Sequence, residues 1–129
     1  MQGLETTATF DQERDEFIIH TPSIRAVKFW PGALGLVGNH AIVFARCIVG
    51  ENDYGVLPFI VQIRDMETHV PLPGISVGDI GSKIGYSTVD NGFLSFDNYR
   101  VPRKNLLSRF TNITRTGEFK VKSHPKVVY

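Results

Sequence analysis

The chain has 129 residues, of which 42% are hydrophobic and 21% charged, a composition typical of one globular domain and not of a disordered or membrane protein. Its 14 Lys and Arg against 13 Asp and Glu give a net charge of +1, which argues against nucleic acid as the main partner because phosphate binding needs a basic excess. No run of about 18 apolar residues is present, so no membrane-spanning helix is expected.

In chain order, the sequence is dominated by strand signals separated by Gly, Pro and polar turns. We expect strands at 4–10, 16–20, 24–30 (ending at Pro31), 40–49, 57–63, 75–80 and 92–101, and only 104–110 is typical of a helix. Residues 4–20 should form a hairpin, and 40–49 is apolar at both alternating sets of positions, as in a closed sheet or between two layers. Six or seven strands at roughly ten-residue spacing indicate a sandwich or barrel.

The reactive side chains do not form a recognisable catalytic set. The histidines (His20, His40, His69 and His124) are far apart and lack metal-ligand spacing, so no metal site is expected. Cys47 lies in an apolar run and is expected to be a buried, inert thiol. Residues 78–85 are glycine-rich but lack the spacing of a phosphate loop. These absences favour a binding or supporting module.

The run 28–35 (KFWPGALG) is the most distinctive stretch. Trp30 offers a flat apolar face, and Gly32 has no Cβ, so a planar ring could approach its main-chain N–H and C=O closely. The alternative, an ordinary strand-to-turn exit, is the more common explanation of an aromatic residue followed by Pro-Gly. At 90–92, Asp-Asn-Gly is typical of a tight hairpin turn, which we prefer to a ligand contact.

Several motifs in order resemble the peroxisomal acyl-CoA oxidases. They are GLETTATFD (3–11), KFWPGALG (28–35), PLPGI (71–75), VGDIG (77–81), DNGF (90–93) and FDNYRVP (96–102) with NLL (105–107). The last two are shared with the wider acyl-CoA dehydrogenase superfamily. The resemblance extends over about residues 2–119, which is nearly the whole chain.

The resemblance implies an all-β fold: an antiparallel, six- to seven-stranded β-barrel of the acyl-CoA dehydrogenase/oxidase middle-domain type. It places this domain at 1–112 and makes 113–129 a linker toward a C-terminal helical domain. It further implies FAD as cofactor, a fatty acyl-CoA and O2 as substrates, and trans-2-enoyl-CoA and H2O2 as products. A homodimeric complete protein and residence in the peroxisome follow from the family in the same way.

By the same resemblance, Gly32 matches a FAD-contacting glycine, and Trp30 and Pro31 flank the flavin. A core tryptophan that never touches flavin is the alternative for Trp30. Dehydrogenases of the superfamily have Trp-Ile-Thr or Trp-Ile-Ser here, so Trp30-Pro31-Gly32 favours an oxidase.

The catalytic glutamate of the family belongs to the helical domain, so no residue here is expected to be catalytic and the isolated fragment should be inactive. A flavin-contacting Thr-Glu-Leu-Gly-His-Gly segment is also expected outside this chain. Two alternatives stay open: an acyl-CoA dehydrogenase middle domain, and a non-enzymatic β-barrel binding module.

Overall fold

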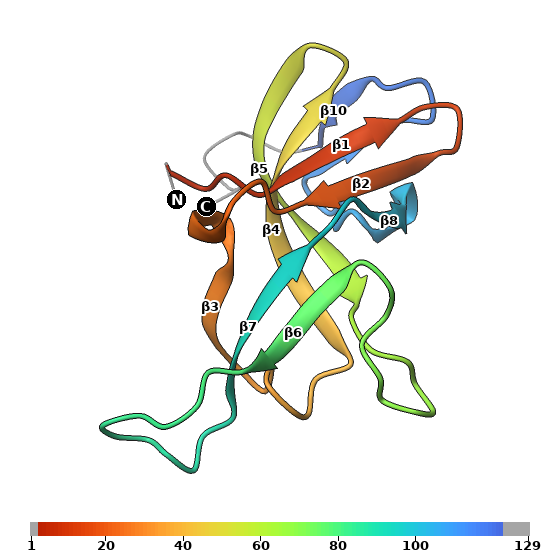
Figure 1. Cartoon of the computed structure of the whole chain (residues 1–129). Helices are drawn as coiled ribbons and strands as arrows, with labels where there is room; N and C mark the ends of the chain where they lie inside the picture. Colours follow the sequence, from red (N-terminus) through yellow and green to blue (C-terminus); the bar gives the residue numbers. More distant parts are fainter. Residues whose placement is uncertain (1–2, 123–129) are drawn as a thin grey trace.

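Ten β-strands and two short 3-10 turns make up the secondary structure of residues 3–122, the part of the chain that this computed structural model describes (Figure 1). The strands are β1 (Thr7–Asp11), β2 (Glu16–His20), β3 (Lys28–Gly32), β4 (His40–Val49), β5 (Asn52–Gln62), β6 (Ile75–Asp79), β7 (Asn91–Phe96), β8 (Tyr99–Pro102), β9 (Thr111–Ile113) and β10 (Phe119–Val121). The turns are η1 (Ile24–Ala26) and η2 (Arg103–Asn105). The expected all-β class is confirmed.

The largest sheet has five strands in the order β5-β4-β1-β2-β8. Its outer hairpin, β4–β5, reverses at Gly50, whose positive φ of 59° suits a tight turn, and Val49 pairs with Asn52 across it. The β1–β2 hairpin confirms the expectation for residues 4–20, with Thr7 opposite His20. These two hairpins join through a parallel pairing of β1 with β4, so the sheet is mixed and not purely antiparallel as expected.

The remaining strands form a three-stranded sheet, β3-β7-β6, and a two-stranded sheet, β10-β9. Hydrogen bonding does not connect the described sheets into a closed ring, so the expected barrel is not seen as a continuous sheet. Figure 1 shows β6 and β7 below the β1–β2 hairpin, and both views show the loop between β6 and β7 projecting from the sheet.

A single hydrophobic core joins the two larger sheets. Phe17 and Phe59 have no exposed surface, and their rings meet edge to face with centroids 5.0 Å apart. The three-stranded sheet adds Leu94 and Phe96 to the same cluster. Apolar contact therefore holds these sheets together, with a backbone hydrogen bond from Thr21 N, just after β2, to the Phe96 carbonyl of β7 beside it.

Three of the expected elements change type or are broken in the structure, and the strand expected at 57–63 begins earlier, at Asn52. Residues 24–26 form a 3-10 turn, and the following strand runs on through Pro31, which an edge strand tolerates because its missing N–H is not needed for pairing. The expected strand 92–101 is broken into β7 and β8 at a turn where Asn98 has a positive φ of 47°. The helix expected at 104–110 is only η2, because Leu106 is bridged to Phe59 in an extended conformation.

The strand β4 is buried on only one face. Val43, Ala45 and Cys47 lie in the core, whereas Ile42 is 60% exposed and Phe44 40% exposed. The expectation that both faces would be covered is therefore wrong for this chain taken by itself. Apolar composition alone did not distinguish a covered face from an open one.

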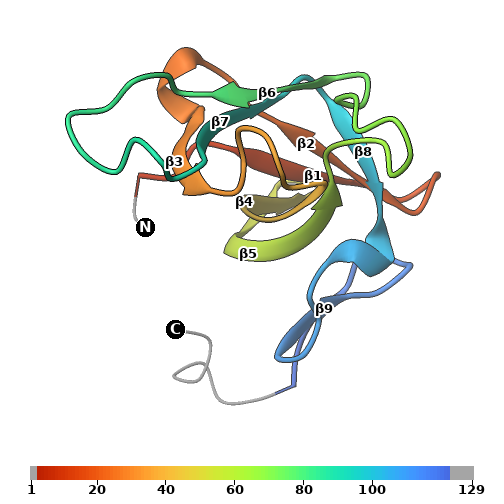
Figure 2. The same cartoon turned by 90° about the horizontal axis from the view of Figure 1, so that it is seen from below.

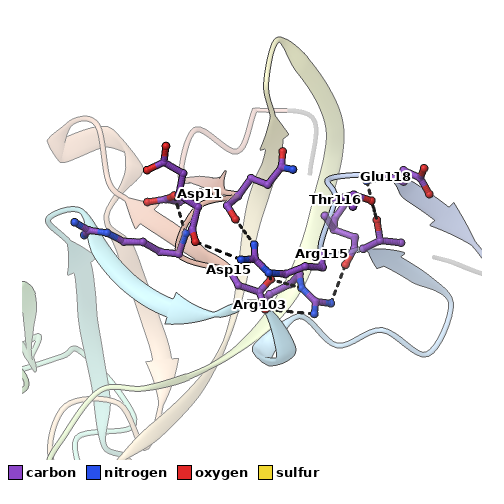
Figure 3. Close-up of polar contacts among 11 residues, drawn as sticks. Asp11, Asp15, Arg103, Arg115, Thr116 and Glu118 are labelled. Carbon is purple, nitrogen blue, oxygen red and sulfur yellow. Dashed lines mark hydrogen bonds and ion pairs between the residues drawn. The ribbon is translucent and has the colours of Figure 1, made fainter.

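The start of the segment expected to be a linker contains β10, which pairs with β9 and packs against β5. Phe119 stacks on Tyr54 with ring centroids 4.4 Å apart, and Figure 2 shows β9 on the side of β8, away from β3. Polar contacts fix this hairpin to the β1–β2 turn. Arg115, between β9 and β10, donates to the Gln12 carbonyl (Figure 3). Arg103 of η2 connects the two, because its Nε lies 2.5 Å from Asp15 Oδ1 and it also donates to the carbonyl of Ile113 in β9 at 3.2 Å. The linker role stays a prediction, and residues 123–129, with His124, lie outside the described residues.

Candidate cofactor-binding site

The candidate site is the free edge of the three-stranded sheet. Strand β3 pairs with β7 on one side and with no named strand on the other, so one of its backbone edges faces outward in the described chain. Phe29 and Trp30 are 63% and 52% exposed, which is unusual for large aromatic side chains. Trp30 is therefore not a core residue of this chain, and the core alternative for it is wrong here.

Gly32 lies at the end of this edge with open space beside it. A Cβ built on Gly32 would meet no atom within 4 Å, and Gly32 is not among the glycines with positive φ. Neither packing nor backbone conformation within the described chain requires a glycine at this position. A planar ligand that approaches the main chain closely would require one.

The backbone that presents Gly32 has an unusual conformation. Trp30 has a φ of 91°, which is rare and strained for a residue with a bulky side chain, and the pairing with β7 shifts between Phe29 and Gly32. The side chain of Asn91 donates from Nδ2 to the Trp30 carbonyl at 2.8 Å, and Ala33 N donates to the Asp90 carbonyl at 2.7 Å. The bulge is therefore fixed from the β7 side of the sheet.

The loop after Gly32 is held by two charged side chains. The guanidinium of Arg64, which is only 4% exposed, donates to the carbonyls of Leu34, Gly35 and Gly38. The carboxylate of Asp90 accepts from the backbone N–H groups of Leu36 and Val37 at 3.1 Å. A buried charge that is hydrogen-bonded on several sides holds its partners in one arrangement, so these two side chains position the loop.

The tripeptide Asp90-Asn91-Gly92 is not the tight turn expected from its sequence. Asn91 begins β7, directly opposite Gly32, and a Cβ on Gly92 would lie 2.4 Å from Gly35 N. The glycine is needed because two backbone segments touch there. This expectation is wrong because pairing with a distant strand determines the conformation.

A shallow apolar groove lies on the same sheet. It has a volume of about 580 Å³ and is lined by Ile24, Arg25, Val27, Phe29, Phe93 and Ser95. This size is within the range of small-molecule sites, about 300–1,000 Å³. The only charged side chain in its lining is Arg25, so its chemistry suits an apolar or anionic ligand.

Among the residues that the structure describes, the remaining reactive groups do not form a second site. Cys47 is fully buried, as expected, and burial, followed by the nearby Asp53 charge, raises the pKa of its thiol to about 12. Across residues 3–122 no three His, Cys, Asp or Glu side chains gather as a metal ion would require. No helix in this described range is long and apolar enough to cross a membrane.

Comparison with known proteins identifies relatives of nearly the whole chain. No protein-family model matches the chain. A curated relative, peroxisomal acyl-coenzyme A oxidase 1 of Arabidopsis thaliana, is 55% identical over 129 residues, which cover 98% of this chain and 19% of the relative. The chain is thus related to one segment of the acyl-CoA oxidases. It spans about a fifth of the length of the relatives it matches.

Solved structures of these oxidases share the fold. The structure of Arabidopsis thaliana acyl-CoA oxidase 1 matches with a TM-score of 0.93 over 97% of this chain and 20% of its own. Acyl-CoA oxidase-2 of Caenorhabditis elegans, bound with FAD, ascaroside-CoA and ATP, is 47% identical and matches with a TM-score of 0.94 over 98% of this chain and 19% of its own. The resemblance found in the sequence motifs is confirmed.

The structure places Trp30, Pro31 and Gly32 together on one exposed edge, and their contact with FAD stays a prediction. Sequence reasoning missed Asn91, which holds this edge, and Arg64, which holds the loop after it. An arginine at the end of an apolar strand was the available signal for Arg64. For Asn91 the signal was the Asn-Gly pair at 91–92, which was interpreted as a turn.

Proposed function

We propose that this chain is the middle domain of a peroxisomal, FAD-dependent acyl-CoA oxidase. The complete protein converts a fatty acyl-CoA and O2 to trans-2-enoyl-CoA and H2O2, the first step of fatty acid β-oxidation. The observation that supports this most directly is the open space beside Gly32, on an exposed aromatic edge of a chain 55% identical to such an oxidase.

The residues present fit FAD. Gly32 leaves room for the rim of a planar ring, and Trp30 supplies a flat apolar surface beside it. Pro31 has no N–H and fixes its own φ, so this stretch of the edge is stiff. When bound, FAD supplies the acceptor for the two electrons removed from the acyl chain. The role proposed for this chain is to bind and orient FAD and to limit which groups lie beside it.

The absence of a side chain at Gly32 favours the oxidase over the dehydrogenase alternative. The dehydrogenases resembled carry a hydroxyl residue at this position, whereas here nothing occupies the space. We propose that this space admits O2 to the flavin. Replacing Gly32 with threonine in the complete protein should lower H2O2 output while acyl-CoA still bleaches the flavin. Unchanged H2O2 output would refute this role for the space.

The base that removes the α-proton is proposed to lie outside this chain, in a helical domain of the complete protein. This chain alone is therefore expected to turn over no substrate. Within the complete protein, we propose that its two larger sheets form the family's barrel and that two protein copies associate as a dimer.

The non-enzymatic alternative is a β-domain that binds another macromolecule. The near-neutral charge disfavours nucleic acid. The deciding experiment measures H2O2 release by the complete protein, reconstituted with FAD and given a saturated acyl-CoA in air. H2O2 formed in step with substrate loss supports the proposal. Flavin bleaching without H2O2 indicates a dehydrogenase, and no flavin response removes the enzymatic assignment.

A further inference from the structure

Strain and an unpaired polar atom coincide at the contact between β3 and β7. Trp30 adopts a φ of 91°, which a residue with a Cβ keeps only when its surroundings hold it there. The neighbouring Asn91 is 5% exposed, and its Oδ1 is the one buried side-chain oxygen or nitrogen without a hydrogen-bond partner among the described residues. Both features are costly, and such costs concentrate at functional sites.

The contact between these residues holds the strained backbone of Trp30 in place. Asn91 Nδ2 donates to the Trp30 carbonyl at 2.8 Å, across 61 positions of sequence, and thereby fixes the peptide unit that joins Trp30 to Pro31. The paired position opposite Asn91 is Gly32 itself. Together with the bond from Ala33 N to the Asp90 carbonyl, this buried amide therefore fixes how the indole ring and the glycine backbone are presented at the open edge.

A purely local role for Asn91 does not account for these observations. Asn is favoured in turns because it tolerates positive φ, but Asn91 is not among the residues with positive φ and lies within a strand. Asparagine is disfavoured in strands, and half of this amide is unsatisfied. What the residue contributes is the donor to Trp30.

We propose that Asn91 is a positioning residue for the cofactor edge. It holds the Trp30 carbonyl, keeps the backbone in its strained conformation, and so directs Trp30 and Gly32 toward the flavin without touching it. This inference rests on the proposed function. In this proposal a residue of β7 shapes a site whose proposed flavin contacts all lie on β3.

The test compares Asn91→Ala with Asn105→Ala in the complete protein. Asn105 makes the same type of bond, from Nδ2 to the Ile60 carbonyl at 3.0 Å, but on η2, away from β3. The measurements are the dissociation constant for FAD, the visible circular dichroism of the bound flavin, and the Tm of the FAD-free protein. Asn91→Ser, which keeps a donor of shorter reach, is a third variant.

Asn91→Ala should bind FAD about tenfold more weakly and change the flavin dichroism, since a directed hydrogen bond is lost. Asn105→Ala should keep the FAD affinity of the parent, and Asn91→Ser should lie between the two. If Asn91→Ala does not fold, the comparison rests on Asn91→Ser. Equal FAD affinity and dichroism in all variants would overturn the assignment, whereas failure of the parent protein to bind FAD would refute the proposed function instead.

Discussion

Gly32 of β3 is paired with Asn91, the residue that precedes Gly92 on β7, and the same substitution should have opposite consequences at the two glycines. A Cβ at Gly32 meets nothing within 4 Å, whereas at Gly92 it would lie 2.4 Å from Gly35 N and 2.7 Å from the Leu34 carbonyl carbon. Alanine at 32 therefore adds a methyl group to open space. Alanine at 92 requires two backbone segments to separate.

The magnitudes follow from these environments. At a compatible position, Gly→Ala raises the free energy of unfolding by about 0.4–1 kcal/mol because it restricts the unfolded chain. Overpacking costs about 1–3 kcal/mol, and more when the obstacle is backbone. With about 3–5 °C for each kcal/mol in a domain of this size, Gly92→Ala should melt about 5–15 °C below Gly32→Ala.

The assay is thermal unfolding of the two variants by circular dichroism, followed by FAD binding in the complete protein. Gly32→Ala should melt about 1–5 °C above the parent and yet bind FAD more weakly, because the added methyl group stands where the ring approaches. A Tm for Gly32→Ala as low as that of Gly92→Ala would show that the edge is not open, and the argument for a ligand there would fail.

Three further predictions concern the body of the domain. Truncating the fully buried Phe17 to alanine should lower the free energy of unfolding by about 3–5 kcal/mol, measured by urea denaturation, and a loss below 1 kcal/mol would contradict the core described here. Hydrogen bonds from Arg103 and Arg100 lower the pKa of Asp15 and Asp11, respectively, below the ordinary 3.8. The contribution of these ion pairs to the free energy of unfolding should thus be fully present above pH 3.8 and be lost as the pH falls through the lowered pKa values. Asp15→Asn should flatten that acid limb, and an unchanged limb would count against the ion pairs. Cys47 should resist a thiol reagent at neutral pH until the protein unfolds, whereas rapid labelling of the native chain would contradict its burial.

Local sequence determined the features that depend on neighbouring residues. The Thr-rich run before a polar turn predicted the β1–β2 hairpin, and the apolar run at 40–49 predicted β4, because side-chain shape and turn chemistry act over a few residues. The ordered motifs predicted the oxidase relationship. The exposed Trp30-Pro31-Gly32 segment could likewise be singled out, since its residues are contiguous.

Tertiary structure alone decided how that segment is held. The Asn-Gly signal at 91–92 predicted a turn, but pairing with β3 made it a strand and turned Asn91 toward the Trp30 carbonyl, 61 residues away. The parallel pairing of β1 with β4 and the hydrogen bonds from Arg64 to the loop after Gly32 are likewise contacts between distant segments. Exposure of one face of β4 depends on what the rest of the chain covers. Such features follow from how separate segments meet in space, which local pattern does not specify.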